Sequence, residues 1–256
     1  MNVTTISLEH TGRFNRIMLD YVNGEEKLGE FCGFAHSKEN YAKHIELRKQ
    51  FPINRNLLAD SLLSQYQAIS GAKDSVLTNI ESLRNENAFT VTTGHQLNIF
   101  TGPLYFVYKI LHTIKLAEEL REAYPDNSFV PIYWMNSEDH DIEEVGQFNL
   151  FGKKYVWETE QPGATGRMNP KTLDELCYQL QEVFSHNEDT LKMVAMFKKA
   201  YTEFENLASA TRYFANELFG EYGLVIIDSD DASLKNSFVE FFKKDILENQ
   251  PYELVR

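Results

Sequence analysis

Three short segments of the chain carry side chains suited to chemistry. They are TTGHQLN (residues 92–98), NSEDHDIEE (136–144) and DSDD (228–231), and each follows a run rich in apolar residues. Imidazole and carboxylate groups transfer protons, and carboxylate oxygens bind Mg²⁺. Glycine allows a ligand to approach the backbone closely. These segments are therefore the candidates for a ligand-binding or catalytic site.

The first segment suits an anion. His95 follows a glycine, and Gly102-Pro103 stands at the start of a predicted helix, whose unpaired N–H groups and positive dipole end attract phosphate. His95 could donate to phosphate oxygens as charge develops in a transition state. Ordinary turn chemistry, with His95 bonded to the loop backbone, is the alternative that the local residues favour. GxxxxGK[ST] and GxGxxG are both missing from the sequence. The candidate phosphate- or substrate-binding residues here are Thr92, Thr93, Gly94, Asn98, Thr101, Gly102, Tyr105 and Lys109.

The second and third segments are acidic. Glu138, Asp139 and His140 suit acid–base chemistry or contact with a substrate, and no residue is assigned as a metal ligand. The alternative is a helix start, because Ser137, Asp139 and Asp141 are good N-cap residues. Asp228, Asp230 and Asp231 carry the same ambiguity, and at least one of them is expected to cap a helix. The candidate binding residues here are Ser137, Asp139, Asp141, Asp228, Asp230 and Trp134, although the strand position of Trp134 favours a place in the core.

Alternating strands and helices are expected to position these segments. AFTVTT (88–93), FVPIYWMN (129–136) and LVIID (224–228) read as strands. The first two are joined by a helix from Pro103, with Leu104, Val107, Tyr108, Leu111 and Ile114 as its expected buried stripe. This pattern predicts an α/β fold with a parallel sheet. Ligands of such sheets collect outside the carboxyl ends of the strands, where all three segments would meet.

Four regions follow from this pattern. Residues 1–86 form a helical N-terminal segment, which includes a helix over 57–69 capped by Asn54 or Asn56. Residues 87–145 form the first half of the core, and 207–256 continue it, with one helix starting at Ser229. Between them, 146–206 form an insertion with a hairpin around Gly152 and helices over 171–206.

Composition narrows the class of protein. The 256 residues carry 25 Lys plus Arg against 38 Asp plus Glu, a net charge of −13, which argues against a nucleic-acid-binding surface. With Cys32 and Cys177 as its two cysteines, the chain is not expected to hold a disulfide framework. The N-terminus has no signal-peptide pattern, and no apolar stretch reaches membrane-spanning length. We therefore expect a cytoplasmic protein that binds no membrane.

Three longer stretches resemble a known family. TTGHQLNIFTGPLYFVYKILHTIKLA (92–117), VPIYWMNSEDHDIEEV (130–145) and LFGEYGLVIIDSDDASLK (218–235) closely resemble the N-terminal half of the cysteine ligases of bacillithiol biosynthesis, the BshC family. The resemblance implies a Rossmann-like core of the nucleotidyltransferase type, as in class I aminoacyl-tRNA synthetases. Thr92-Thr93-Gly94-His95 would then correspond to their HxGH phosphate loop, with Thr92 in place of the first histidine.

The resemblance also implies an activity. The family joins L-cysteine to glucosaminyl malate, which requires activation of a carboxyl group, and ATP with Mg²⁺ is the expected cofactor. In an acyl-adenylate route, residues 93–102 would hold phosphates, Glu138 or Asp139 would partly hold Mg²⁺, and His95, Glu138 and His140 would be catalytic. Family members run to roughly twice this length, with a C-terminal coiled coil and a homodimer expected, so the chain is expected to be truncated. A nucleotidyltransferase acting on another small acidic or sugar substrate, or a non-catalytic binding or dimerising fragment, are the alternatives.

Overall fold

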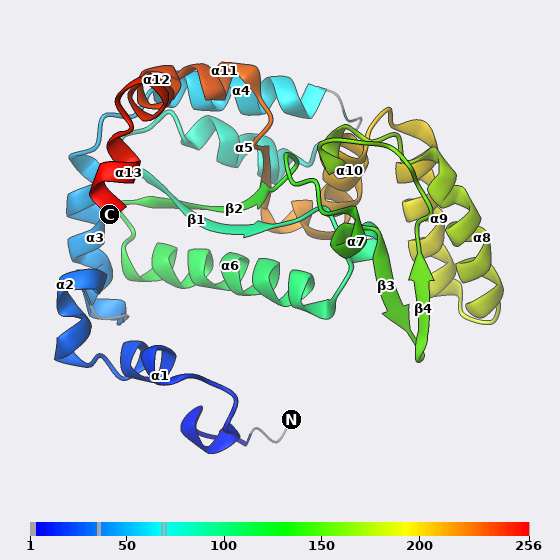
Figure 1. The fold of residues 1–256 in the computed structure, drawn as a ribbon, viewed down its shortest axis with the longest axis horizontal. Helices are drawn as coiled ribbons and strands as arrows, with labels where there is room; N and C mark the ends of the chain where they lie inside the picture. Colours follow the sequence, from blue (N-terminus) through cyan, green and yellow to red (C-terminus); the bar gives the residue numbers. More distant parts are fainter. Residues whose placement is uncertain (1–3, 35–36, 68, 70, 256) are drawn as a thin grey trace. The chain divides into compact units, whose positions relative to one another are not determined.

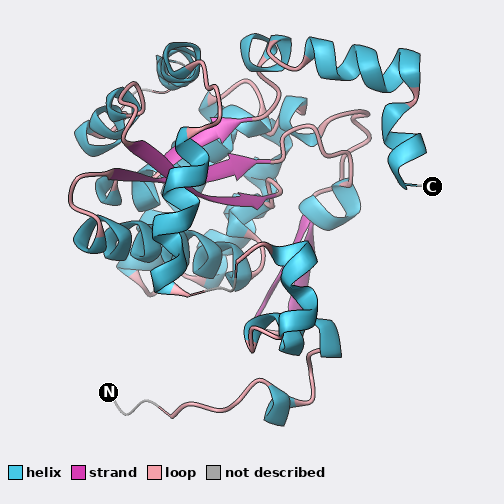
Figure 2. Ribbon diagram, turned by 90° about the vertical axis from the view of Figure 1, so that its left-hand side faces the viewer, coloured by secondary structure: helices cyan, strands magenta, loops and turns pink. Residues whose placement is uncertain are grey.

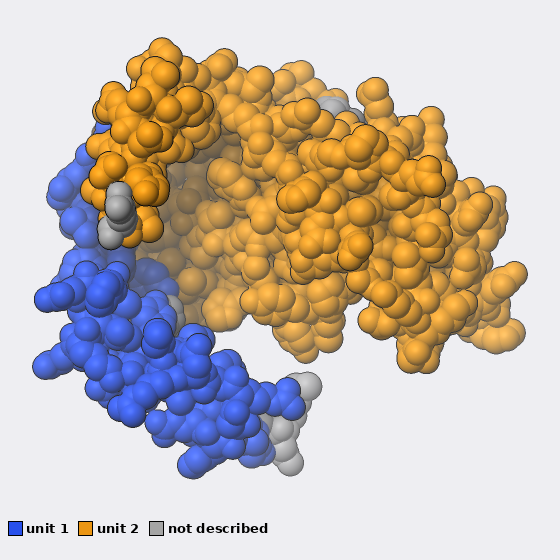
Figure 3. Space-filling view, viewed as in Figure 1, with its two compact units in different colours: residues 1–53 blue, residues 54–256 orange. Residues whose placement is uncertain are grey.

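A computed structural model describes residues 4–34, 37–67, 69 and 71–255. The chain divides into two compact units, residues 1–53 and 54–256 (Figure 3). In the first unit, the side chain of Asn15 caps α1 by accepting from the N–H of Met18 at 3.0 Å. The elements of this unit are η1 (Glu9–Thr11), α1 (Arg16–Val22), η2 (Glu26–Leu28), α2 (Gly29–Cys32), η3 (Lys38–Asn40) and α3 (Tyr41–Lys49).

A parallel sheet of three strands forms the centre of the second unit. Its order is β1 (Ala88–His95), β2 (Ser128–Met135) and β5 (Val225–Asp228). His95 lies beside Met135 in the register, and Met135 lies beside Asp228. The three strands therefore end at one edge of the sheet, and the predicted α/β fold is confirmed.

Helices cover both faces of this sheet (Figures 1 and 2). α6 (Leu104–Ala123) packs on one face, against β1 and β2. α4 (Arg55–Gln67) and α5 (Asp74–Ser82) pack on the other face, chiefly against β2 and β5. Asn54 caps α4 by accepting from the N–H of Leu57 at 3.1 Å, as one of the two expected caps. In the described residues, every helix is too short or too polar to cross a membrane.

The buried stripe of α6 differs from the expected one. Leu104 is 64% exposed, and Tyr108 and Leu111 are exposed as well. Pro103 is the N-cap rather than the first helical residue. Apolar residues occur around the whole circumference of the first turns of α6, so their spacing does not select a single face. The residues that face the sheet are Phe106, Ile110, Thr113, Ile114, Ala117 and Leu120.

The insertion has the predicted hairpin and helices. β3 (Gln147–Leu150) and β4 (Lys153–Val156) pair antiparallel. Phe151 and Gly152 join them with φ values of 49° and 78°, the left-handed pair that suits a tight hairpin. The helical elements near the insertion are α7 (Ile142–Val145), η5 (Thr165–Arg167), η6 (Lys171–Leu173), α8 (Asp174–Val183) and α9 (Glu188–Glu203).

The segment after the insertion returns to the sheet. α10 (Leu207–Phe219) and η7 (Gly220–Tyr222) lead into β5. The single helix expected from Ser229 is instead α11 (Ala232–Asn236), α12 (Val239–Glu248) and α13 (Gln250–Val255). The break comes where the hydroxyl of Ser237 donates to the carbonyl of Leu234. Such a side-chain bond competes with the helical ladder.

Candidate functional site

The loop between β1 and α6 is held in an unusual backbone conformation. Phe100, Thr101 and Gly102 have φ values of 51°, 67° and 52°. The N–H of Phe100 donates to the buried hydroxyl of Tyr201 at 2.7 Å, which anchors the loop to α9. η4 (Ile99–Thr101) is therefore a kinked turn rather than a regular helix. Left-handed residues that are not glycine cost free energy, so the surrounding packing must impose this shape.

His95 lies at the base of this loop. Its ring packs edge-on against Phe106, with ring centroids 5.4 Å apart, and lies near Tyr105. Nδ1 is 3.2 Å from the carbonyl oxygen of Gln96. Burial lowers the pKa of His95 below its ordinary 6.5, although the Gln96 carbonyl opposes this shift. A neutral imidazole is therefore favoured at neutral pH.

The N-terminus of α6 is open to an anion. No side chain in the described residues caps this end of α6. Tyr105 is exposed there, and the ammonium of Lys109 donates to the carbonyl of Gly94. The helix end and the ammonium of Lys109 thus offer donors around one loop, which is the arrangement that phosphate or carboxylate oxygens require.

The second segment is tied to the first by Gln96. Its amide Nε2 donates to Asp139 at 2.7 Å and to Glu144 at 3.1 Å. The N–H of Asp141 also donates to Asp139 at 3.0 Å. The Asp141 N–H, and secondly the Gln96 amide, lower the pKa of Asp139. Asp141 itself caps α7 by accepting from the N–H of Glu144 at 3.0 Å.

The insertion covers the second segment. The N–H of Gly166 donates to the carbonyl of Ser137 at 2.9 Å, and the N–H of Thr165 donates to the carbonyl of Asp139 at 2.7 Å. A Cβ at Gly166 would lie 2.6 Å from the Cβ of Ser137, closer than real Cβ atoms approach. Close backbone contact therefore fixes η5 against the turn that follows β2.

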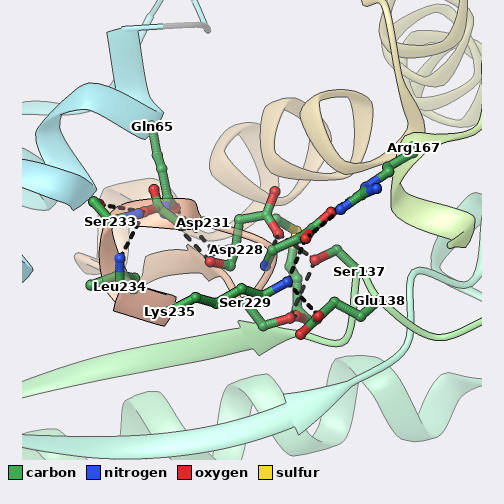
Figure 4. Close-up of polar contacts among 12 residues, drawn as sticks. Gln65, Ser137, Glu138, Arg167, Asp228, Ser229, Asp231, Ser233, Leu234 and Lys235 are labelled. Carbon is green, nitrogen blue, oxygen red and sulfur yellow. Dashed lines mark hydrogen bonds and ion pairs between the residues drawn. The ribbon is translucent and has the colours of Figure 1, made fainter. Parts of the chain in front are cut away.

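The third segment meets the second at Ser137. The buried hydroxyl of Ser137 donates to Oδ1 of Asp228, and the N–H of Asp230 donates to the same oxygen at 3.0 Å. The hydroxyl of Ser229 donates to the carbonyl of Met135 at 2.9 Å. Figure 4 shows these contacts, which join the turns after β2 and β5.

The carboxylate of Asp230 binds two cations beside this junction, Arg167 and Lys235, and Figure 4 labels both. Nε and Nη2 of Arg167 lie 2.5 and 2.8 Å from its two carboxylate oxygens. Nζ of Lys235 lies 2.6 Å from Asp230 and 2.5 Å from Glu138. The Arg167 hydrogen bonds, opposed by burial and helped by Lys235, lower the pKa of Asp230 to about 2. Asp231 turns away and caps α11 by accepting from the N–H of Ser233 and of Leu234, which is the capping role expected for one of the three aspartates.

The predicted core position of Trp134 is wrong. Its side chain is 42% exposed, while its neighbour Tyr133 is fully buried against Phe106. Side chains alternate between the faces of a strand, so Trp134 lies on the face opposite α6. There its register neighbour is Gly94, which has no side chain to cover it.

The predicted site residues therefore fall into two groups along one edge of the sheet. The first surrounds His95, with Gly94, Asn98, Gly102, Tyr105, Lys109 and Asp139 near it. The second surrounds Ser137, with Glu138, Asp228 and Asp230. His140, Thr92 and Trp134 are exposed. The backbone of His140 hydrogen-bonds to the carboxylate of Asp139, and Trp134 meets the first group through its strand pairing with Gly94.

Sequence reasoning missed several residues of the site. Gln96 stands within the first motif, so its position was a usable signal. Ser229 likewise stands within the third motif, and Lys235 follows it closely. The others are distant in the sequence and carry no local signal: Gln65, Arg167 and Arg212. Among the described residues, no group of three or more His, Cys, Asp or Glu side chains is arranged to hold a metal ion.

Comparison with known proteins agrees with this architecture. Residues 1–255 match the family model described as "Bacillithiol biosynthesis BshC, N-terminal Rossmann-like domain". A protein of Flavobacterium johnsoniae is 44% identical over 100% of this chain and 49% of its own length. One of Cytophaga hutchinsonii is 39% identical over 96% of this chain and 45% of its own length. One of Bacillus cereus is 26% identical over 95% and 46%.

All three relatives carry the name "Putative cysteine ligase BshC". The chain spans about half the length of these curated relatives, with 49% of the length covered in the Flavobacterium johnsoniae protein. The match to the family model extends over the helical first unit as well as the sheet. The chain therefore belongs to the BshC family of bacillithiol biosynthesis and corresponds to its N-terminal Rossmann-like domain.

Proposed function

We propose that this chain is the substrate-activating part of a ligase that joins the carboxyl group of L-cysteine to the amine of glucosaminyl malate. The name of its relatives supports a cysteine ligase. The observation that carries the proposal is the meeting of the turns after β1, β2 and β5 at one edge of the sheet. In parallel α/β folds, this edge is where ligands bind.

Amide formation in water needs an activated carboxyl group, and ATP with Mg²⁺ is the cofactor that we propose. The loop before α6 fits phosphate oxygens, because the uncapped N-terminus of α6 and Lys109 offer donors around it and His95 lies beside them. When bound, ATP would supply the phosphoryl or nucleotidyl group that makes the carboxylate oxygen a leaving group. Nδ1 of His95 is held by the carbonyl of Gln96, so His95 would donate to a phosphate oxygen through Nε2 in its protonated form, which the phosphate charge stabilises, and Lys109 would hold the charge beside it.

Magnesium would enter with the nucleotide. Asp139 accepts from Gln96, and Glu138 pairs with Lys235, so neither stands in a prepared cage of carboxylates. Mg²⁺ commonly binds to one or two carboxylates, several waters and the phosphates of its substrate. The proposal therefore assigns most of its ligands to phosphate and water.

Mass spectrometry of the reaction tests this function. The purified chain is incubated with cysteine, glucosaminyl malate and Mg-ATP, and the cysteinyl product and the nucleotide products are measured. Replacing His95→Ala is expected to slow product formation about 100-fold. His112→Ala is the matched control, because His112 is an exposed histidine of α6, and its rate should equal that of the wild-type chain.

Each outcome has a distinct meaning. Product with AMP or ADP supports the ligase and names the activation route. Product without nucleotide consumption overturns the activation step. Binding of substrates without product favours the second candidate, a non-catalytic ligand-binding half. The homodimer of the full-length family is a further proposal, and light scattering of the Flavobacterium johnsoniae protein tests it.

A further inference from the structure

Asp228 has an accessible oxygen and no ion-pair partner among the described residues. Its Oδ1 accepts from the hydroxyl of Ser137 and from the N–H of Asp230 at 3.0 Å. The neighbouring cations are engaged elsewhere, since Arg167 and Lys235 both bind to Asp230. Among the described residues, Oδ2 of Asp228 accepts no hydrogen bond. It is also missing from the buried oxygens that lack a partner, so it is accessible to solvent. One carboxylate oxygen is thus held in place and left open to a donor.

A buried cation lies behind this carboxylate. Arg212 of α10 is only 3% exposed, and it forms no ion pair in the described residues. Its Nη2 donates to Oε1 of Gln65 at 2.8 Å, while its Nε has no partner. Burying a guanidinium without a carboxylate costs free energy, so such an arrangement calls for a compensating role.

Gln65 connects Arg212 to the turn that follows β5. Its Oε1 also accepts from the N–H of Asp228 at 2.9 Å, and its Nε2 donates to Asp231 at 2.9 Å. Two donors face the amide oxygen, and an acceptor faces the amide nitrogen, which fixes the orientation of the amide. Figure 4 shows Asp228 between Gln65 and Ser137.

We propose that Asp228 binds a primary ammonium group of a substrate through Oδ2 and that Arg212, acting through Gln65, is the residue that positions it. This inference rests on the proposed function, in which cysteine and the glucosamine unit both carry such a group. The local charge favours a cationic ligand, because among the described residues the four carboxylates of Asp228, Asp230, Asp231 and Glu138 lie beside three cations: Arg167, Lys235 and the buried Arg212. A charged hydrogen bond to a fixed carboxylate is strong and directional.

Paired ligands test the ammonium site. Isothermal titration calorimetry of the chain compares cysteine with 3-mercaptopropionate, and glucosaminyl malate with its N-acetyl derivative. The second member of each pair lacks the ammonium group. At least one ammonium ligand is expected to bind about 10- to 100-fold more tightly than its partner, and Asp228→Asn should abolish that preference. The pair that shows the preference identifies the substrate whose amine is bound.

A second variant tests positioning. Gln65→Met keeps the length of the side chain and removes the amide, so the preference for the ammonium ligand is expected to fall about 5- to 10-fold. Affinity for the partner without ammonium should stay the same, which a general loss of structure would not allow. Gln67→Met is the control, because Gln67 is an exposed glutamine of the same helix.

The results separate this inference from the proposed function. An equal affinity within both pairs, or no binding of any of the four ligands, overturns the ammonium site, as does a preference that persists in Asp228→Asn. An unchanged preference in Gln65→Met overturns the positioning role. Formation of the cysteinyl product without an ammonium preference would retain the ligase and reject the site. An ammonium preference without product would do the reverse.

Discussion

Gly102 meets two constraints at once. Its φ of 52° is in the left-handed region, and a Cβ there would lie 2.4 Å from the Cβ of Asn98. Asn98 is itself buried, and its Nδ2 donates to the carbonyl of Glu144 at 3.3 Å. A side chain at position 102 would therefore disturb the contact between the β1–α6 loop and α7.

The substitution Gly102→Ala is expected to destabilise the chain by about 2–4 kcal/mol, the sum of backbone strain and a core clash. Gly152→Ala separates these causes, because Gly152 has a φ of 78° but open space around its Cβ position. It should cost only about 1 kcal/mol. Urea unfolding of both variants measures the difference, and equal losses would show that the clash with Asn98 is relieved at little cost.

His95 makes stability depend on pH. Burial, the largest cause, lowers its pKa in the folded chain below 6.5, so the unfolded chain binds more protons in mildly acidic solution. The stabilisation from neutral His95 is complete above the unfolded pKa. It is lost as the pH falls from about 6.5 towards the lowered folded value.

Unfolding free energies at a pH of about 7.5 and about 5.5 test this dependence. The wild-type chain should lose more stability on acidification than His95→Gln, which cannot titrate. The exposed residue His112 supplies the control substitution His112→Gln. Identical losses in the wild-type chain and His95→Gln would contradict a lowered pKa of His95.

At the level of elements, two neighbouring residues of α6 lie on opposite sides of the helix, one facing the sheet and one facing solvent. Ile110 is fully buried against the sheet, and Leu111 is 44% exposed. Ile110→Ala is expected to cost about 2–4 kcal/mol, because it leaves a cavity. Leu111→Ala should cost less than about 1 kcal/mol. Urea unfolding measures both, and a reversed order would mean that the stripe beginning at Leu104 is the one that faces the core.

Local pattern predicted the elements better than it predicted their contacts. The strands, the hairpin at Gly152 and the cap at Asn54 depend on residues that are neighbours in the sequence. The facing of α6 could not be predicted, because apolar residues surround its first turns. The break between α11 and α12 depends on one hydroxyl contact of Ser237.

Side-chain contacts between segments that are distant in the sequence could not be predicted. The motif positions correctly placed Ser137 and Asp228 at one edge of the sheet. Gln65, however, is 147 positions from Arg212 and 163 from Asp228, and it is one of two glutamines on α4. Pairing at such separations is decided by packing of the whole unit, which no local spacing reports.

At the scale of the molecule, the second unit contains the sheet and every candidate site residue. Residues 50–53, the last residues of the first unit, are exposed, as is Lys49 at the end of α3. Brief trypsin treatment is therefore expected to cut after Lys49 and to leave a stable fragment that starts at residue 50. Mass spectrometry identifies the cut. The fragment should unfold cooperatively, and rapid digestion of α4 would show that the sheet depends on the first unit.

The two edge strands of the sheet, β1 and β5, differ in how their outward backbone groups are hydrogen-bonded. On β5, the N–H of Ile226 donates to the hydroxyl of Tyr66 at 2.9 Å, and the N–H of Asp228 donates to Gln65 at 2.9 Å. Side chains of α4 thus occupy the places where a further strand would bind. On β1, side chains bind the outward backbone at its two ends. Arg55 donates to the carbonyl of Ala88 at 3.0 Å, and Lys109 donates to the carbonyl of Gly94.

Between these two cations, the outward backbone groups of Thr90 and Thr92 have no strand beside them in the described residues. An edge of this kind recruits a strand from any chain that reaches it. In a concentrated solution, two copies of the chain would therefore pair along their β1 strands. Larger assemblies would not form, because the β5 strand has no open edge at which a third copy could add.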